Sequence, residues 1–282
     1  MRRSALATVL ALAGLTAAAT GCGSSEHRNV HPEALLDAAA ARPVTSGQAQ
    51  IRLRVQVVGV SALSSPLTLN LEGPYVSGHG VRIPSFDWKL TASALGFPVE
   101  GRVASTGEDV YLSVYGDNYY VGTDTVAATN TRLREAGDRG TLPGVHPRTW
   151  FGRALYEGDG NAGGTDCARI AAPLRGDAVA RDLADLWAWA GLTAPPRVSG
   201  TATACVGFDD HVIHELTVVA EIAVPPGDRE RLHGASAAHV SLEVENSDVG
   251  QPQQISKPGG GGYRPIQELL LTLNDLGLPI PL

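Results

Sequence analysis

Cysteine, histidine and aspartate are the residue types in this 282-residue chain that allow a chemical role. Two of the three cysteines, Cys167 and Cys205, lie in the second half of the chain. Neither belongs to a Cys-x-x-Cys pair, and neither has a histidine at the spacing that a zinc site needs. The sequence therefore predicts no metal site at these two cysteines.

Asp209, Asp210, His211 and His214 form a second group. Carboxylates beside imidazoles are typical of acid-base catalysis or of half a metal site. A spacing of three in a strand sends the two rings to opposite faces, however, and a Phe-Asp-Asp-His run between two strands is typical of a turn. We interpret the histidines as a pair of surface residues, with neither a catalytic nor a metal-binding role.

Two common signatures of enzymes are also missing from the sequence. The chain has no Gly-x-Ser-x-Gly elbow, which marks many exported hydrolases. The glycine run at 259–262 lacks the Gly-Lys-Ser/Thr ending of a phosphate loop, so it is interpreted as a flexible connection. We predict a protein that is not an enzyme and that carries no cofactor.

Cys22 is the residue with the clearest chemical prediction. Arg2 and Arg3 precede an apolar run from Ala5 to Ala19, and small residues lead into Cys22. These are the charged, apolar and cleavage regions of a secretory signal peptide. A cysteine directly after them resembles the lipobox of bacterial lipoproteins, in which the thiol is diacylated, with palmitate as one acyl chain. The alternative is a cleaved signal followed by an ordinary free thiol.

The lipobox divides the chain into three parts. Residues 1–21 are predicted to be a lipoprotein signal peptide, 22–30 an acylated cysteine with a flexible polar tether, and 31–282 a single lipoprotein domain. A dual acyl anchor at Cys22 would hold this domain on the outer face of a bacterial cell membrane without spanning it. An exported location makes a disulfide between Cys167 and Cys205 the default expectation.

The charge of the chain argues against two classes of partner. The formal net charge is −7, and it becomes −9 once Arg2 and Arg3 leave with the signal peptide. An acidic protein is a poor ligand for nucleic acids and for anionic lipid head groups. No second apolar run approaches the roughly 20 residues that span a bilayer, so we expect the lipid anchor to be the only membrane attachment.

Apolar and polar residues alternate in several segments, as in strands with one buried face. The segments are 51–57, 67–71, 110–114, 216–224 and 240–244. Glycine, proline and aspartate collect between the segments, for example at Gly73-Pro74, and predict turns. The pattern predicts an antiparallel sheet of about ten strands with one apolar face.

Helical patterns occur at 31–41, 124–136, 147–156, 177–190 and 265–276. The strongest is 177–190, whose apolar residues lie within an arc of roughly 160°. Its members, together with a tryptophan from 147–156, are candidates for the wall of an apolar ligand cavity: Trp150, Val179, Leu183, Leu186, Trp187 and Ala190. The alternative is that they form an ordinary core between helix and sheet. Strands interrupted by helices indicate an α+β domain.

The order of these features resembles the LppX/LprG-type cell-wall lipoproteins of mycobacteria and other actinobacteria, which are similar in architecture to the LolA/LolB carriers. The segments that carry the resemblance are the lipobox at Cys22, the helix at 31–41, Gly107-Glu108-Asp109-Val110-Tyr111, Gly116-Asp117-Asn118-Tyr119-Tyr120-Val121, Trp150 in Pro-Arg-Thr-Trp, 163–170, 247–249 and 255–258. The resemblance implies a curved antiparallel sheet, a U-shaped half-barrel, with helices packed on its concave face. It also implies an apolar cavity that takes lipid or glycolipid acyl chains.

These observations predict a membrane-anchored, monomeric protein that binds lipid for transport or presentation in the cell envelope. The alternative is an envelope scaffold or interaction lipoprotein with a filled core, whose protein partner the sequence does not identify. An exported hydrolase would require a nucleophile, a base and an orienting group to converge, and the sequence shows no trace of them.

Overall fold

The computed structural model describes residues 30–42, 44–78, 82–94, 96–136, 147–184, 187, 192–259 and 262–275. Within these ranges, twelve strands form one sheet. The strands are β1 (Ser46–Val58), β2 (Leu67–Val76), β3 (Ser85–Ala94), β4 (Phe97–Ser105), β5 (Val110–Val114), β6 (Asp117–Tyr120), β7 (Leu155–Ala162), β8 (Thr165–Pro173), β9 (Arg197–Gly207), β10 (Ile213–Ala223), β11 (Ala237–Ser247) and β12 (Arg264–Pro265).

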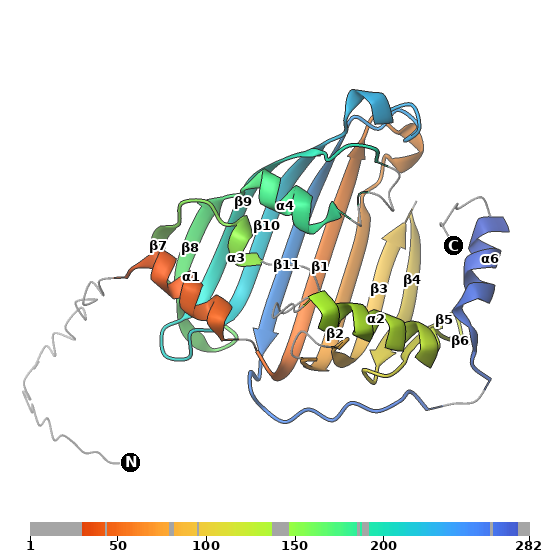
Figure 1. Ribbon diagram of the computed structural model, residues 1–282, viewed down its shortest axis with the longest axis horizontal. Coiled ribbons are helices and arrows are strands. Elements are labelled where there is room, and N and C mark those ends of the chain that lie inside the picture. The colour runs from red at the N-terminus through yellow and green to blue at the C-terminus, as the bar shows by residue number, and fades with distance from the viewer. Residues whose placement is uncertain are drawn as a thin grey trace, which may run out of the picture.

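The spatial order of the strands joins two halves of the chain. The order is β12-β6-β5-β4-β3-β2-β1-β11-β10-β9-β8-β7, so β1 and β11 are neighbours at the middle of the sheet. All neighbours are antiparallel except β12, which pairs with β6 in parallel through two residues. The sheet is open and curved, and its two edges are β7 and β12 (Figure 1). The predicted antiparallel sheet with helices on one face is confirmed.

Helices cover the ends of one face of this sheet. They are α1 (Pro32–Ala41), α2 (Thr123–Ala136), α3 (Pro147–Trp150) and α4 (Gly176–Asp182), with α6 (Ile266–Asp275) beside the β6 edge. In Figure 1, α1, α3 and α4 lie in front of the β7 half of the sheet, and α2 lies in front of the other half. No helix in the described part of the chain is long and apolar enough to span a membrane.

Two of the predicted helices differ from the structure. The helix predicted at 147–156 ends at Trp150, because Phe151 bridges to Leu174 and Gly152 donates its N–H to the Pro173 carbonyl. A Cβ on Gly152 would lie only 2.8 Å from that carbonyl oxygen, so the chain passes Pro173 in a space that only glycine fits. The helix predicted at 177–190 is interrupted at Leu183: α4 ends at Asp182, and Ala184 and Trp187 are again helical, with the Trp187 N–H donating to the Leu183 carbonyl.

The turn predicted at Gly73-Pro74 is also wrong, because β2 runs through both residues. Gly73 has a φ of 150°, and a Cβ there would lie 2.2 Å from the Asp87 carbonyl oxygen on β3. Glycine at this position therefore permits a close approach of two strands. A proline beside a glycine marks a turn in most sequences, and here it marks an irregular point inside a strand.

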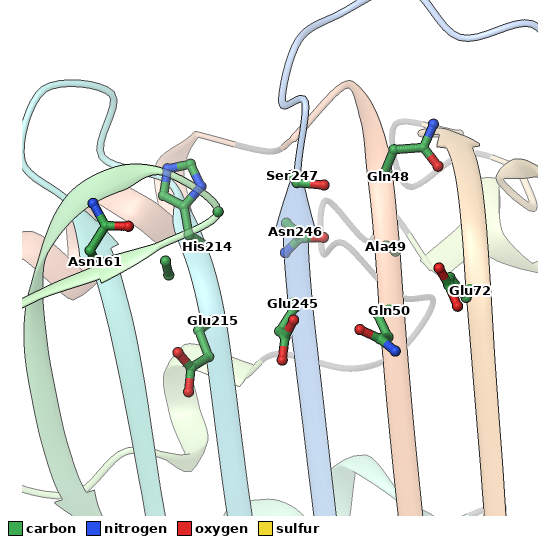
Figure 2. A pocket seen from close by; sticks show the side chains of 12 residues that line it. Gln48, Ala49, Gln50, Glu72, Asn161, His214, Glu215, Glu245, Asn246 and Ser247 are labelled. Carbon is green, nitrogen blue, oxygen red and sulfur yellow. The ribbon is translucent and has the colours of Figure 1, made fainter.

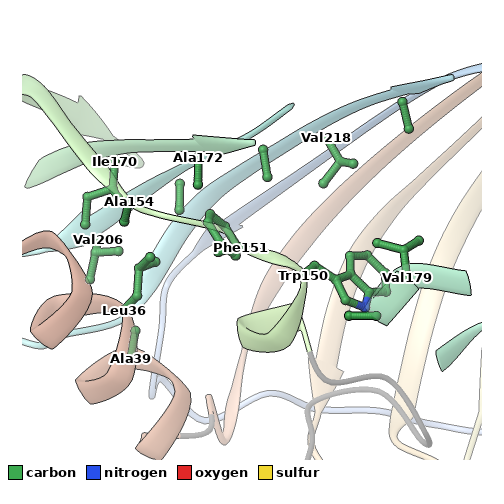
Figure 3. Close-up of a cluster of buried hydrophobic side chains, with 14 of the residues drawn as sticks. Leu36, Ala39, Trp150, Phe151, Ala154, Ile170, Ala172, Val179, Val206 and Val218 are labelled. Carbon is green, nitrogen blue, oxygen red and sulfur yellow. The ribbon is translucent and has the colours of Figure 1, made fainter. Parts of the chain in front are cut away.

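The main hydrophobic core lies between the sheet and the helices α1, α3 and α4 (Figure 3). Ile170 of β8 and Val206 of β9 are 0% exposed, and Leu36 of α1 is 1% exposed. Alanines on β8 and β9 let the helices approach the sheet closely. The helices at this end are thus fixed by a filled core.

The predicted disulfide between Cys167 and Cys205 is present in the structure, with a Cα–Cα distance of 5.4 Å. Both cysteines alternate with core residues such as Ala168 and Ala204, so their side chains lie on the face of the sheet away from the helices. Ala162, at the tip of the β7–β8 hairpin, packs against them. We call this side the open face.

Asp228, in the loop after β10, is hydrogen-bonded to the segment before β9. Its carboxylate is 1% exposed and accepts hydrogen bonds from the Thr193 hydroxyl, the Thr193 N–H and the Arg231 guanidinium. These bonds, above all the one from the Thr193 hydroxyl, lower the pKa of Asp228 from its ordinary value, although burial acts in the opposite direction.

This pKa shift predicts a loss of stability in acid. A carboxyl whose pKa is lower in the folded protein stabilises the fold above its unfolded pKa, about 4, and this contribution disappears as the pH falls through the folded pKa. We expect Asp228→Asn to lower the urea midpoint at pH 7 and to flatten its decline below about pH 4. Urea unfolding at a series of pH values measures both. Parallel pH profiles for the two proteins would contradict the prediction.

Candidate functional site

Apolar side chains of neighbouring strands lie opposite one another and form rows across the middle of the sheet. In the central row, Leu53 of β1 lies between Leu242 of β11 and Leu69 of β2. The row continues to Val218 of β10 and to Ala92 of β3. Neighbouring strands are about 4.8 Å apart, so this row across five strands is about 19 Å wide.

Two further rows flank the central one on the same face. One row consists of Leu216, Val244, Ile51, Leu71 and Leu90. The other consists of Ala220, Val240, Val55 and Leu67. The three rows together form a continuous aliphatic surface, which we call the apolar face.

The apolar face is covered at one end and partly exposed in the middle. Val218 and Ala220 of β10 are buried in the core with α4, whereas Leu53, Leu69 and Leu242 remain only partly buried. The strands β1 and β2 run between α4 and α2 (Figure 1). Partly exposed aliphatic side chains in a continuous row are a feature of ligand-binding or interaction surfaces.

Trp88 of β3 adds a polar group to this face. Its neighbour across the strands is Val103, and its ring stacks on Phe86 at a centroid distance of 4.2 Å. The indole N–H is buried, and within the described part of the chain it has no hydrogen-bond partner. A buried N–H without an acceptor is unusual, because it costs free energy. A ligand that lies on the apolar face could supply that acceptor.

Tyr75 lies on the same face, at the C-terminal end of β2. Its hydroxyl donates a hydrogen bond to the Asn246 side-chain oxygen at 3.2 Å. Burial raises the pKa of Tyr75 to about 12, so the phenol stays neutral over the physiological range. Tyr75 and Asn246 therefore join β2 and β11 through a neutral contact.

The described residues that were predicted to line a cavity lie at the covered end of the apolar face, in the core that also contains Val218 and Ala220. Trp150 and Val179 are 8% and 6% exposed and belong to the filled core, with the Trp150 indole N–H donating to Asp182 at 2.9 Å (Figure 3). Leu183 packs against that core, and the Trp187 indole N–H donates to the Ala180 carbonyl at 3.0 Å.

Three predicted site residues lie outside the described part of the chain. They are Leu186, Ala190 and the predicted lipidation site Cys22. Sequence reasoning recognised the alternation that makes the apolar face, but it assigned the ligand to the tryptophan-rich helix. It did not single out Trp88, although this tryptophan lies two residues from both Phe86 and Leu90, the spacing of residues that share one face of a strand.

The histidine pair is arranged differently from the prediction. Residues 208–211 do form a turn, with His211 at a φ of 55°. His214, in contrast, is 4% exposed and not a surface residue. In the part of the chain that the structure describes, no group of three or more histidine, cysteine, aspartate or glutamate side chains is arranged to hold a metal ion.

No protein-family model and no curated protein sequence matches this chain. Among solved structures, the chain is similar to the lipoprotein LppX of Mycobacterium tuberculosis, with 13% identity, coverage of 79% of this chain and 97% of that one, and a TM-score of 0.40. It is also similar to LprF of Mycobacterium bovis, with 10% identity, coverage of 81% of this chain and 97% of that one, and a TM-score of 0.44. A third similar structure is a LolA superfamily protein of Nitrosomonas europaea, with 7% identity, coverage of 81% of this chain and 98% of that one, and a TM-score of 0.26.

Proposed function

We propose that this protein is an exported, membrane-anchored lipoprotein that binds the acyl chains of a lipid or glycolipid on its apolar face. The observation that carries the proposal is the continuous aliphatic surface of β10, β11, β1, β2 and β3, whose central side chains are only partly buried. Acyl chains would complete its burial, and the protein would transport or present the lipid in the cell envelope.

The chemistry of the surface suits an acyl chain. The rows contain leucine, isoleucine, valine and alanine and no charged side chain. Burial of apolar area stabilises a complex by about 25 cal/mol per Å², or about 0.8 kcal/mol for each methylene group, without contacts specific for one chain. The Trp88 indole N–H, which has no partner in the described part, would donate to an ester or hydroxyl oxygen of the lipid.

The proposal predicts that a polar group in the central row weakens lipid binding. We expect Leu53→Gln to reduce the affinity for a dansyl-labelled fatty acid about tenfold, because an amide replaces an aliphatic contact worth on the order of 1.5 kcal/mol. Fluorescence titration measures the affinity. Native mass spectrometry of the purified protein, with lipid extraction, identifies any bound natural lipid.

Val219→Gln is the matched control for this test. Val219 is on β10, is 52% exposed and alternates with Val218, so its side chain lies on the open face. We expect it to leave binding of the labelled fatty acid within twofold of the original protein. Equal affinities for the two variants, at equal melting temperatures, would refute binding on the apolar face.

A second function is favoured by the packing beneath the helices. Trp150, Val179 and Ile170 belong to a filled core, as expected for an envelope scaffold or interaction lipoprotein. Such a protein would take up no labelled fatty acid and would show a mass without bound lipid. The titration therefore separates the two functions.

A further inference from the structure

A pocket of about 450 Å³ lies on the open face, away from the proposed lipid surface (Figure 2). Glu215, Glu245 and Glu72 line it from β10, β11 and β2, and His214 lies at its upper end beside the β7–β8 hairpin. The cross-strand neighbours Glu215 and Glu245, and Gln50 and Glu72, establish that these side chains share one face.

A β-bulge brings the histidine to this pocket. The β9–β10 pairing shifts register between Ile213 and Glu215, so His214 is an extra residue in β10. An extra residue interrupts the alternation of the strand, and His214 and Glu215 therefore line the same pocket although they are consecutive. Bulges re-aim side chains in this way beside functional sites.

His214 presents one unused nitrogen. Its Nε2 lies 2.8 Å from the Asp210 carboxylate, and a carboxylate accepts but does not donate. In the neutral form of the ring, Nε2 therefore carries the proton and Nδ1 is a hydrogen-bond acceptor. Within the described residues Nδ1 is buried without any partner, and the imidazole is 4% exposed. A donor is missing at this position.

Three carboxylates, which accept but do not donate hydrogen bonds, also line the pocket. Glu215 and Glu72 form no ion pair or hydrogen bond with the described residues. Glu245 accepts from Arg52 at 2.7 Å, but Arg52 is shared with Glu243 and does not line the pocket. The lining contains three carboxylates and no lysine or arginine. Its electrostatic potential favours a positively charged ligand.

We propose that this pocket binds a small organic cation with primary ammonium groups. An ammonium group has three donors and no acceptor, which matches the carboxylates and the bare Nδ1 of His214. The described part of the chain offers no cluster of three ligands for a metal ion, and the pocket has room for an aliphatic diamine. This site lies on the opposite face from the proposed lipid surface, so the two proposals can fail independently.

Pentane-1,5-diamine is the probe, and its binding is measured by calorimetry at pH 7.5 in 150 mM salt. At this salt concentration the attraction of a cation to distant charges of an acidic protein is screened beyond about 8 Å. We expect saturable binding that Glu215→Gln weakens about tenfold. Glu221→Gln is the matched control, because Glu221 is exposed on the same strand and face but does not line the pocket. It removes the same charge and is expected to change binding less than twofold.

A second readout reports on His214 directly. The ¹⁵N resonance of its Nδ1 is expected to shift as the diamine is added, because the nitrogen gains a donor. Absence of saturable binding, equal weakening by both variants, or binding without a shift of Nδ1 would each overturn the proposal. Nα-acetyllysine amide is titrated in parallel to distinguish two sources of the ammonium group. Tighter binding of the diamine indicates that the natural ligand is a free molecule. Tighter binding of the lysine derivative indicates that it is a lysine side chain of a partner protein.

Discussion

Replacement of Cys167 and Cys205 together by alanine is expected to lower the free energy of unfolding by about 4 kcal/mol. The disulfide spans 38 residues, from β8 to β9, and closes a loop that includes α4. A cross-link of this span restricts the unfolded chain, which is the main source of the stabilisation in the chain-entropy account. Urea unfolding of the original protein and of the double variant measures the difference.

The packing around the sulfurs adds to this effect. Cys167 and Cys205 are 0% and 2% exposed, and Ala162 at the β7–β8 hairpin contacts them. A reducing agent is expected to shift the urea midpoint of the original protein towards that of the double variant and to leave the variant unchanged. A midpoint that the reductant does not move would contradict a stabilising disulfide.

Cys22→Ala is expected to transfer the protein completely from the membrane fraction to the soluble fraction. The proposed anchor consists of acyl chains on Cys22, and each buried methylene group contributes about 0.8 kcal/mol to membrane binding. Two chains hold a protein stably, whereas a chain without them has no comparable attachment. Cell fractionation measures the transfer, and the mass of the N-terminal peptide reports the acyl groups.

The double alanine variant of Cys167 and Cys205 serves as the control for this experiment. It also replaces cysteine by alanine but leaves the lipobox intact, so we expect it to remain with the membrane. Continued membrane association of Cys22→Ala would refute the anchor, and it would favour the reading in which Cys22 is an ordinary thiol after a cleaved signal.

Local periodicity predicted five of the twelve strands in the described part of the chain, β1, β2, β5, β10 and β11, because each of them buries one face. The alternation at 51–57 and 240–244 lies within β1 and β11, and both contribute to the apolar face. The strand β7 was not predicted, since Glu157, Gly158 and Asp159 interrupt any alternation there. An edge strand depends on pairing with one neighbour, and its own residues carry a weak signal.

The functional surfaces depend on contacts that a single sequence does not display. The alternation identifies an apolar face, but only the strand order shows that Leu53 lies between Leu69 and Leu242. The burial of His214 follows from a bulge, and one extra residue leaves no mark in the pattern of the strand. Both properties arise from the pairing of segments that lie far apart in the chain.

The pairing of β1 with β11 also determines when this protein can finish folding. Eleven cross-strand pairs join the two strands, from Gln48 with Ser247 to Val58 with Ala237. Contacts between such distant segments form late, because a long loop must close first. A nascent chain that is exported from its N-terminus keeps β1 without its central neighbour until residue 247 has crossed. Under the proposed export, the sheet would therefore close only after the chain has crossed the membrane.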